Sequence, residues 1–179
     1  MTQPRPAIGL DTAPARPTPL GASFLAFVGY AALMLALERR MLQTGGPGII
    51  PFELAGNASR AEAIMARWGS AGQRAARLSL RLDFGYMATY GTFIALLVDR
   101  TRRRRGHSAV VPSMVIVAVA GDAIEGISLL KVLDGTRVGV HARRAQIAAL
   151  IKFAVLGGAL GYVAASHLPS ARTPGRQRS

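Results

Sequence analysis

The sequence contains no cysteine, and only two of its 22 basic residues, Lys131 and Lys152, are lysines. The absence of cysteine excludes disulfides, thiolate metal sites and thiol redox chemistry. Each of the three histidines lies at the end of an apolar run or in a link, without a second ligand at helical spacing, so we expect no metal site. A nucleophile elbow and a glycine-rich phosphate loop are also missing. We therefore expect no cofactor and no catalytic residue.

Charged residues are scarce and mostly basic, whereas apolar residues are abundant. Half of the 179 residues are hydrophobic, only 17% are charged, and the formal net charge is +13. The apolar residues form long runs flanked by arginines, which indicates contact with a lipid bilayer and its anionic headgroups. No motif that reads a nucleic-acid groove accompanies the charge, so we expect no nucleic-acid partner. The arginine- and alanine-rich composition is typical of GC-rich bacterial genomes and favours the bacterial cytoplasmic (inner) membrane.

Several segments approach the roughly 20 apolar residues that a helix needs to cross a bilayer. We expect spans at about residues 21–42, 80–99, 109–131 and 145–166. A cleaved signal peptide is the alternative for the first, but its long proline-rich lead and the lack of an A-x-A site favour a retained helix. The sequence therefore predicts an all-α fold, a four-helix transmembrane bundle in a single domain over residues 21–168.

The segments outside the spans differ in character. Residues 1–20 hold five of the ten prolines and show no apolar periodicity, which predicts a disordered tail, and residues 169–179 form a second, basic one. In the first loop, residues 49–52 are expected as an extended apolar piece at the membrane surface. An interfacial helix is expected at about 59–69, with a capping box at Ser59 and Glu62 and with Trp68 at headgroup depth.

A short, strongly basic link predicts the orientation of the chain. It contains Arg102, Arg103, Arg104 and Arg105. Under the positive-inside rule this link stays in the cytoplasm, which places both termini there as well. The other arginines are almost evenly distributed between the two sides, so dual insertion is a second possibility.

The third apolar run carries two carboxylates, Asp122 and Glu125, which lie three residues apart on one helical face. Placing a carboxylate in contact with lipid carries a high free-energy cost, so this face should turn toward other helices or a water-filled cavity. By helical rise they lie about 14 and 9 Å deep, and Lys152 on the next run lies about 12 Å deep on the same side. We therefore predict that Lys152 pairs with one or both acids.

A third acid, Asp83, enters the second run from the same side and is followed by Tyr86 and Tyr90. The resulting surplus of acid over base suggests a non-enzymatic site that binds a cation, a proton or a small polar ligand. Two alternatives stay open: the charges fix helix packing in a structural or accessory subunit, or the protein is a membrane-embedded enzyme. Tyrosines in such positions are more often packing aromatics than catalytic acids.

A stripe of small residues follows on the fourth run, formed by Gly157, Gly161 and Ala165. Such a stripe lets helices approach closely. We expect packing within the chain first and contact between two copies, as in a homo-oligomer, second.

Four pieces carry a resemblance to a known group of sequences: FELAGNASRAEAIMARWG, ARLSLRLDF, GDAIEGISLL and IKFAVL. Together they resemble uncharacterised bacterial four-span membrane proteins over about residues 52–156. The resemblance implies a four-helix membrane bundle in which Asp83, Asp122, Glu125 and Lys152 belong together. Gly126 stands where that group usually has asparagine, and the group brings no reaction or ligand with it.

Overall fold

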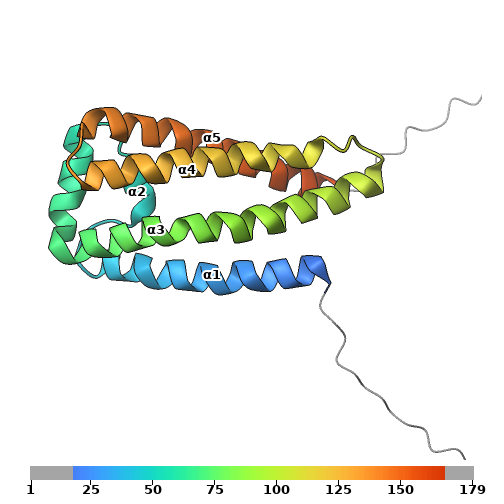
Figure 1. The fold of residues 1–179 in the computed structure, drawn as a ribbon, viewed down its shortest axis with the longest axis horizontal. Helices are drawn as coiled ribbons and strands as arrows, with labels where there is room; N and C mark the ends of the chain where they lie inside the picture. Colours follow the sequence, from blue (N-terminus) through green and yellow to red (C-terminus); the bar gives the residue numbers. More distant parts are fainter. Residues whose placement is uncertain (1–17, 168–179) are drawn as a thin grey trace, which may run out of the picture.

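The computed structural model describes residues 18–167, which are almost entirely helical and include no strand. Their elements are α1 (Pro19–Leu42), α2 (Ile49–Glu53), α3 (Ala58–Arg105), the 3-10 turn η1 (Val111–Ser113), α4 (Met114–Leu133) and α5 (Val138–Ala165). Helices α1, α4, α5 and most of α3 run along the long axis of the molecule (Figure 1). The prediction of an all-α chain is confirmed.

Three segments of the structure are long and apolar enough to cross a membrane: Pro19–Leu42, Val111–Leu133 and Val138–Ala165. They correspond to the first, third and fourth expected spans. The second, at about 80–99, lies inside α3 and is not among the three, so a span there stays a prediction.

The N-terminal end of α1 lies earlier than expected. Thr18 caps the helix, since its side-chain oxygen accepts a hydrogen bond from the Gly21 amide at 3.2 Å, and Pro19 follows in the first turn. Residues 18–20 therefore do not belong to the expected tail. The rest of that tail, and residues 168–179, lie outside the described part of the chain.

A kink at Gly69 divides α3 into two parts. This glycine has φ 55° and ψ −167°, a backbone conformation that side-chain-bearing residues rarely adopt. The first part, residues 58–68, which we call the arm, runs across the ends of the long helices (Figure 1). Asn57 caps it by accepting a hydrogen bond from the Arg60 amide at 2.9 Å. The predicted capping box at Ser59 was therefore wrong, because the helix begins one residue earlier and Asn57 is its capping residue.

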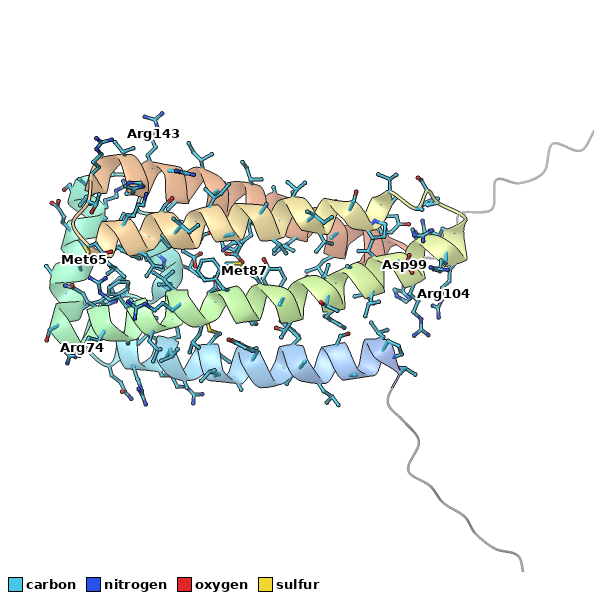
Figure 2. All side chains as sticks on the ribbon, viewed as in Figure 1. Met65, Arg74, Met87, Asp99, Arg104 and Arg143 are labelled. Atoms are coloured by element: carbon cyan, nitrogen blue, oxygen red, sulfur yellow. The ribbon has the colours of Figure 1, made fainter. Side chains whose placement is uncertain are left out.

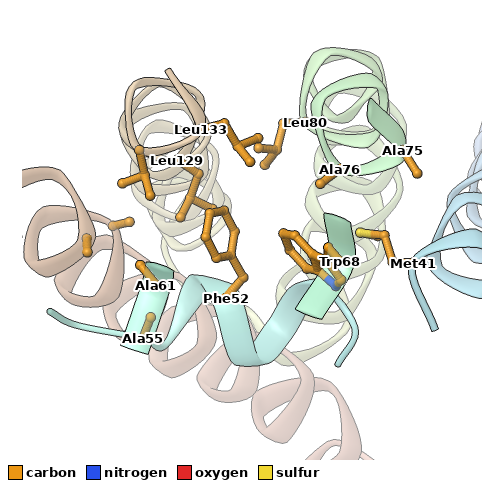
Figure 3. Close-up of a cluster of buried hydrophobic side chains, with 13 residues drawn as sticks. Met41, Phe52, Ala55, Ala61, Trp68, Ala75, Ala76, Leu80, Leu129 and Leu133 are labelled. Carbon is orange, nitrogen blue, oxygen red and sulfur yellow. The ribbon is translucent and has the colours of Figure 1, made fainter. Parts of the chain in front are cut away.

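The arm turns its apolar face inward, against the buried side chains of the protein. Trp68 is 1% exposed and meets Phe52 edge to face, with ring centroids 4.9 Å apart (Figure 3). The indole Nε1 donates to the Pro47 carbonyl. Trp68 is buried within the protein because the loop before the arm folds back and supplies both the ring partner and the hydrogen-bond acceptor, and its position at headgroup depth stays a prediction.

The piece at 49–52 is helical and not extended, with Ile50 and Pro51 exposed and Phe52 buried. It forms most of α2, and the Glu38 carboxylate caps it by accepting from the Ile49 amide at 3.0 and 3.2 Å. Phe52 is buried among the side chains drawn in Figure 3. Capping by a residue of α1 and burial of this ring explain why the segment becomes helical.

The basic link is helical as far as Arg105, and α3 ends at Gly106 in the left-handed conformation. Within it, Asp99 forms ion pairs with Arg102 and Arg103 at 2.6 and 2.7 Å. Arg104 lies at one end of the molecule, and Arg74 and Arg143 lie at the other (Figure 2). Arginines thus occupy both ends, and the orientation of the chain stays a prediction.

Candidate functional site

Helices α4 and α5 approach each other closely beside the predicted charges. A methyl group added to Gly121 would lie 3.4 Å from the Ala148 carbonyl oxygen of α5, so the glycine permits this approach. Asp122 and Glu125 follow Gly121 on α4, and Lys152 lies one turn after Ala148 on α5. The helix pair therefore brings acid and base to one level.

Lys152 bridges both acids of α4. Its Nζ lies 2.9 Å from Asp122 Oδ1 and 2.8 Å from Glu125 Oε2. The three residues are 7%, 3% and 2% exposed, respectively. The prediction that Lys152 pairs with these acids is confirmed. Removing such charges from water is expensive, so each depends on the others for compensation.

Tyr90 of α3 provides a second hydrogen-bond donor to the Asp122 carboxylate. Its hydroxyl donates to Asp122 Oδ2 at 2.7 Å, while Oδ1 faces Lys152. Both oxygens of this carboxylate are therefore occupied, and three helices meet at one side chain.

Sequence reasoning missed Glu53, which belongs to the same cluster. Its Oε2 lies 3.7 Å from Lys152 Nζ, and the residue is only 8% exposed. No group within residues 18–167 donates a hydrogen bond to this oxygen. Burial, the largest influence, raises the pKa of the Glu53 carboxyl, and the Lys152 ammonium acts against that rise. The only sequence signal was an acid directly after an apolar run, which does not predict burial.

A cavity of about 590 Å³ adjoins the cluster. Glu53, Asp122, Lys152 and the half-buried Asp83 all lie on its wall. Asp83 takes part in no ion pair with another described residue. The structure thus places Asp83 next to the predicted cluster but leaves its charge unmatched there.

Tyr86 also lines the cavity, in a row of aromatic rings between α1 and α3. Its ring centroid lies 5.8 Å from that of Phe27, 6.0 Å from that of Tyr30 and 5.5 Å from that of Tyr90. Both predicted tyrosines therefore face the cavity, but only Tyr90 reaches a carboxylate.

The cluster and the cavity wall together carry more acid than base. The carboxylates are Glu38, Glu53, Asp83, Asp122 and Glu125, and Lys152 is the single ammonium among them. In residues 18–167, no three or more His, Asp or Glu side chains are arranged so that they could hold a metal ion. This arrangement can hold a positively charged group or take up protons.

The small-residue stripe does not pack as first expected. Gly157 and Gly161 lie on an exposed face of α5, and a methyl group added to either would meet nothing within 4 Å. Ala165 is exposed as well. The expectation of packing within the chain was wrong because α5 presents this face outward, and contact between two copies stays a prediction.

No protein-family model, curated protein or solved structure matches the chain. The resemblance to bacterial four-span proteins therefore stays a prediction.

Proposed function

We propose that this chain is a multi-pass protein of the bacterial cytoplasmic membrane that binds a small cation or protonated ligand beside Lys152. The observation that carries this proposal is the unmatched acid on the cavity wall. Glu53 Oε2 is buried without a hydrogen-bond donor, and Asp83 has no cationic partner within the described residues. Lys152 is one ammonium shared among several carboxylates and compensates them only in part, so a cation at this position would lower the free energy of the folded state.

The proposal includes a fourth span in α3 and cytoplasmic termini. After Gly69, α3 runs through 36 residues to Arg105, which corresponds to about 54 Å and exceeds the thickness of a bilayer core. Apolar side chains such as Phe84 are exposed on its outer face, as lipid contact requires. Labelling of a cysteine introduced at position 104 tests the orientation, because the chain has no native thiol. We expect protection from an impermeant reagent added outside intact cells, and labelling from outside would reverse the orientation.

One observation favours a structural role as the second candidate. Lys152 already contacts both acids of α4, so the pair could serve only to fix the packing of α4 against α5. In that case no added cation should change the stability of the protein.

Ligand-dependent stability separates the two candidates. We expect ethylammonium, added at constant ionic strength to protein in phosphatidylcholine nanodiscs, to raise the unfolding temperature. The rise should reach the equivalent of about 2.7 kcal/mol at a concentration of 100 times Kd. Glu53→Gln and Asp83→Asn should weaken this response, whereas Glu62→Gln on the exposed side of the arm should not. An equal response in all four proteins, or none in the wild type, would remove the proposed site.

A further inference from the structure

The cavity beside Lys152 has two chemically different halves, arranged in the same order on three helices. On α5 its wall is formed by Lys152, Leu156 and Leu160, which follow one another at intervals of four residues. On α3 the lining residues are, in order, Ser79, Leu80, Asp83, Tyr86, Tyr90 and Ile94, so aromatic and apolar side chains follow the charge there too. Residues four apart share a helix face, so each helix presents a charge followed by about 12–16 Å of mainly apolar wall.

The third helix repeats this order in the opposite chain direction. On α1 the wall runs from Glu38 through Met34 and Ala31 to Phe27. Because α1 is antiparallel to the long part of α3, its charged residue lies at the same end of the cavity as Asp83 (Figure 1). All three helices therefore place charge at the end nearest α2 and apolar side chains toward the middle of the molecule.

The cavity opens sideways between α1 and α5. Helix α1 packs against α3, whereas α5 packs against α4 and α3. Lining residues on this side are large, apolar and exposed: Leu35, Ile50, Phe153 and Leu160. In a membrane such a rim faces acyl chains and not water. A ligand that reaches the charged end by this route must tolerate lipid.

The charged end selects the sign of the ligand. A carboxylate or phosphate would add like charge next to Glu53 and Asp83. An ammonium group offers three donors and no acceptor, which suits a set of carboxylate oxygens. Lys152 itself demonstrates the fit, since its ammonium lies within 3.7 Å of three carboxylates.

We infer that the cavity binds a single-chain amphiphilic amine, which enters from the lipid between α1 and α5, places its ammonium beside Glu53 and Asp83, and lays its chain along Ala31 and Leu156. This inference rests on the proposed cation site and adds the apolar half of the ligand. A volume of about 590 Å³ suits a small-molecule ligand.

Paired variants on α1 test the apolar half. Ala31 lies on the cavity wall, while the neighbouring Ala32 is exposed on the outer side of the same helix. Dodecylammonium is added to protein in phosphatidylcholine nanodiscs, and unfolding is followed by the fluorescence of Trp68, the only tryptophan of the chain. We expect stabilisation of the wild type and of Ala32→Phe. Ala31→Phe should raise the concentration needed for half the effect at least tenfold.

The head group is tested with the same nanodiscs. Glu53→Gln should weaken the dodecylammonium response, and dodecanol, which has the same chain without the charge, should give none. If ethylammonium acts at equal concentration and Ala31→Phe has no effect, the cation site stands and the amphiphile is excluded. If neither amine stabilises the wild type, both proposals fail. Equal responses of all variants to dodecylammonium would show partition into lipid only and would overturn the inference.

A photoreactive group at the end of the ligand's alkyl chain tests the same inference without the Ala31→Phe variant, in case that variant does not fold. A dodecylammonium analogue with a diazirine at the far end of its chain is photolysed in the wild-type nanodiscs. We expect crosslinks at Phe27, Leu156 or Leu160. Crosslinks spread over the outer faces of the helices would contradict the inference.

Discussion

Helices α4 and α1 are both apolar and of similar length, yet they are used in opposite ways. Ten of the 20 residues of α4 are buried, including Asp122 and Glu125. Only three of the 24 residues of α1 are buried, namely Ser23, Leu37 and Met41. Helix α4 packs against both α3 and α5, whereas α1 packs against α3. An apolar helix in this chain can therefore be buried at the centre of the bundle, as α4 is, or lie on its outside, as α1 does. The hydropathy of the helix does not distinguish the two cases.

The difference in burial between α1 and α4 indicates which wall of the cavity can move. The charged cluster is built on α4 and α5 with Tyr90 of α3, all of which are held by several neighbours. Helix α1 supplies one wall of the cavity, but only three of its residues are buried and it packs against α3 alone among the long helices. We expect α1 to be the wall that shifts when a ligand enters, because segments with few buried contacts open at the lowest free-energy cost.

Removal of the central ammonium should have the largest effect. Lys152→Met leaves Asp122 and Glu125 buried without a counter-charge, so we expect the free energy of unfolding to fall by about 3–5 kcal/mol. Reversible unfolding in detergent micelles measures it. Lys131→Met, at the exposed end of α4, is the control and should change stability by no more than about 0.5 kcal/mol. Equal stability of both variants would show that the ion pairs do not hold α4 and α5 together.

Truncation of leucines compares the two helices directly. Leu129 on α4 is fully buried, so Leu129→Ala should cost about 2–5 kcal/mol by loss of transfer energy and creation of a cavity. Leu25 on α1 is 66% exposed, and Leu25→Ala should cost no more than about 0.5 kcal/mol. The same unfolding measurement applies. A similar loss for Leu25 would show that a second chain covers the outer face of α1.

Loss of one hydroxyl tests the link from α3 to α4. Tyr90→Phe removes the hydrogen bond to Asp122, and a bond to a charged group contributes about 1.5–3 kcal/mol. Tyr86→Phe is the matched control, since no hydrogen bond of the Tyr86 hydroxyl is found in the described residues, and its stability should be nearly unchanged. If the two variants behave alike in chemical unfolding, Asp122 does not depend on α3.

The smallest effect is expected from pH. Glu53 lies outside the long helices, and burial raises its pKa above the ordinary value of 4.5. The folded chain therefore holds this proton more tightly than the unfolded chain. Its contribution to stability is complete below the ordinary pKa and is lost as the pH rises through the raised one. Unfolding measured from pH 4 upward should show this decline in the wild type, and Glu53→Gln should flatten it. An identical pH profile of both proteins would contradict the assignment.

The pairing of Lys152 with Asp122 and Glu125 could be predicted because every step was local. Charges inside apolar runs are conspicuous, helical rise converts residue number into depth, and a short link makes adjacent runs antiparallel. The same reasoning placed Asp83 at the level of these charges, and the structure has it on the wall of the adjoining cavity.

Glu53 and Trp68 could not be placed in this way, because their surroundings come from distant parts of the chain. Helix α2 depends on a cap from Glu38, and Trp68 depends on Pro47 and Phe52. The glycine stripe failed for a related reason. Small residues indicate that another helix could approach this face of α5 closely. They do not indicate which face of α5 packs against α4.

The turn at residues 134–137 has a consequence for biosynthesis. Lys152 follows Asp122 by thirty positions, so the carboxylates of Asp122 and Glu125 leave the ribosome before the lysine that pairs with them. An isolated aspartate at the centre of a bilayer helix costs about 2.5–3.5 kcal/mol on insertion scales. We expect α4 to wait at the translocon until α5 has been made, so that the two enter the lipid as one hairpin with its charges already joined.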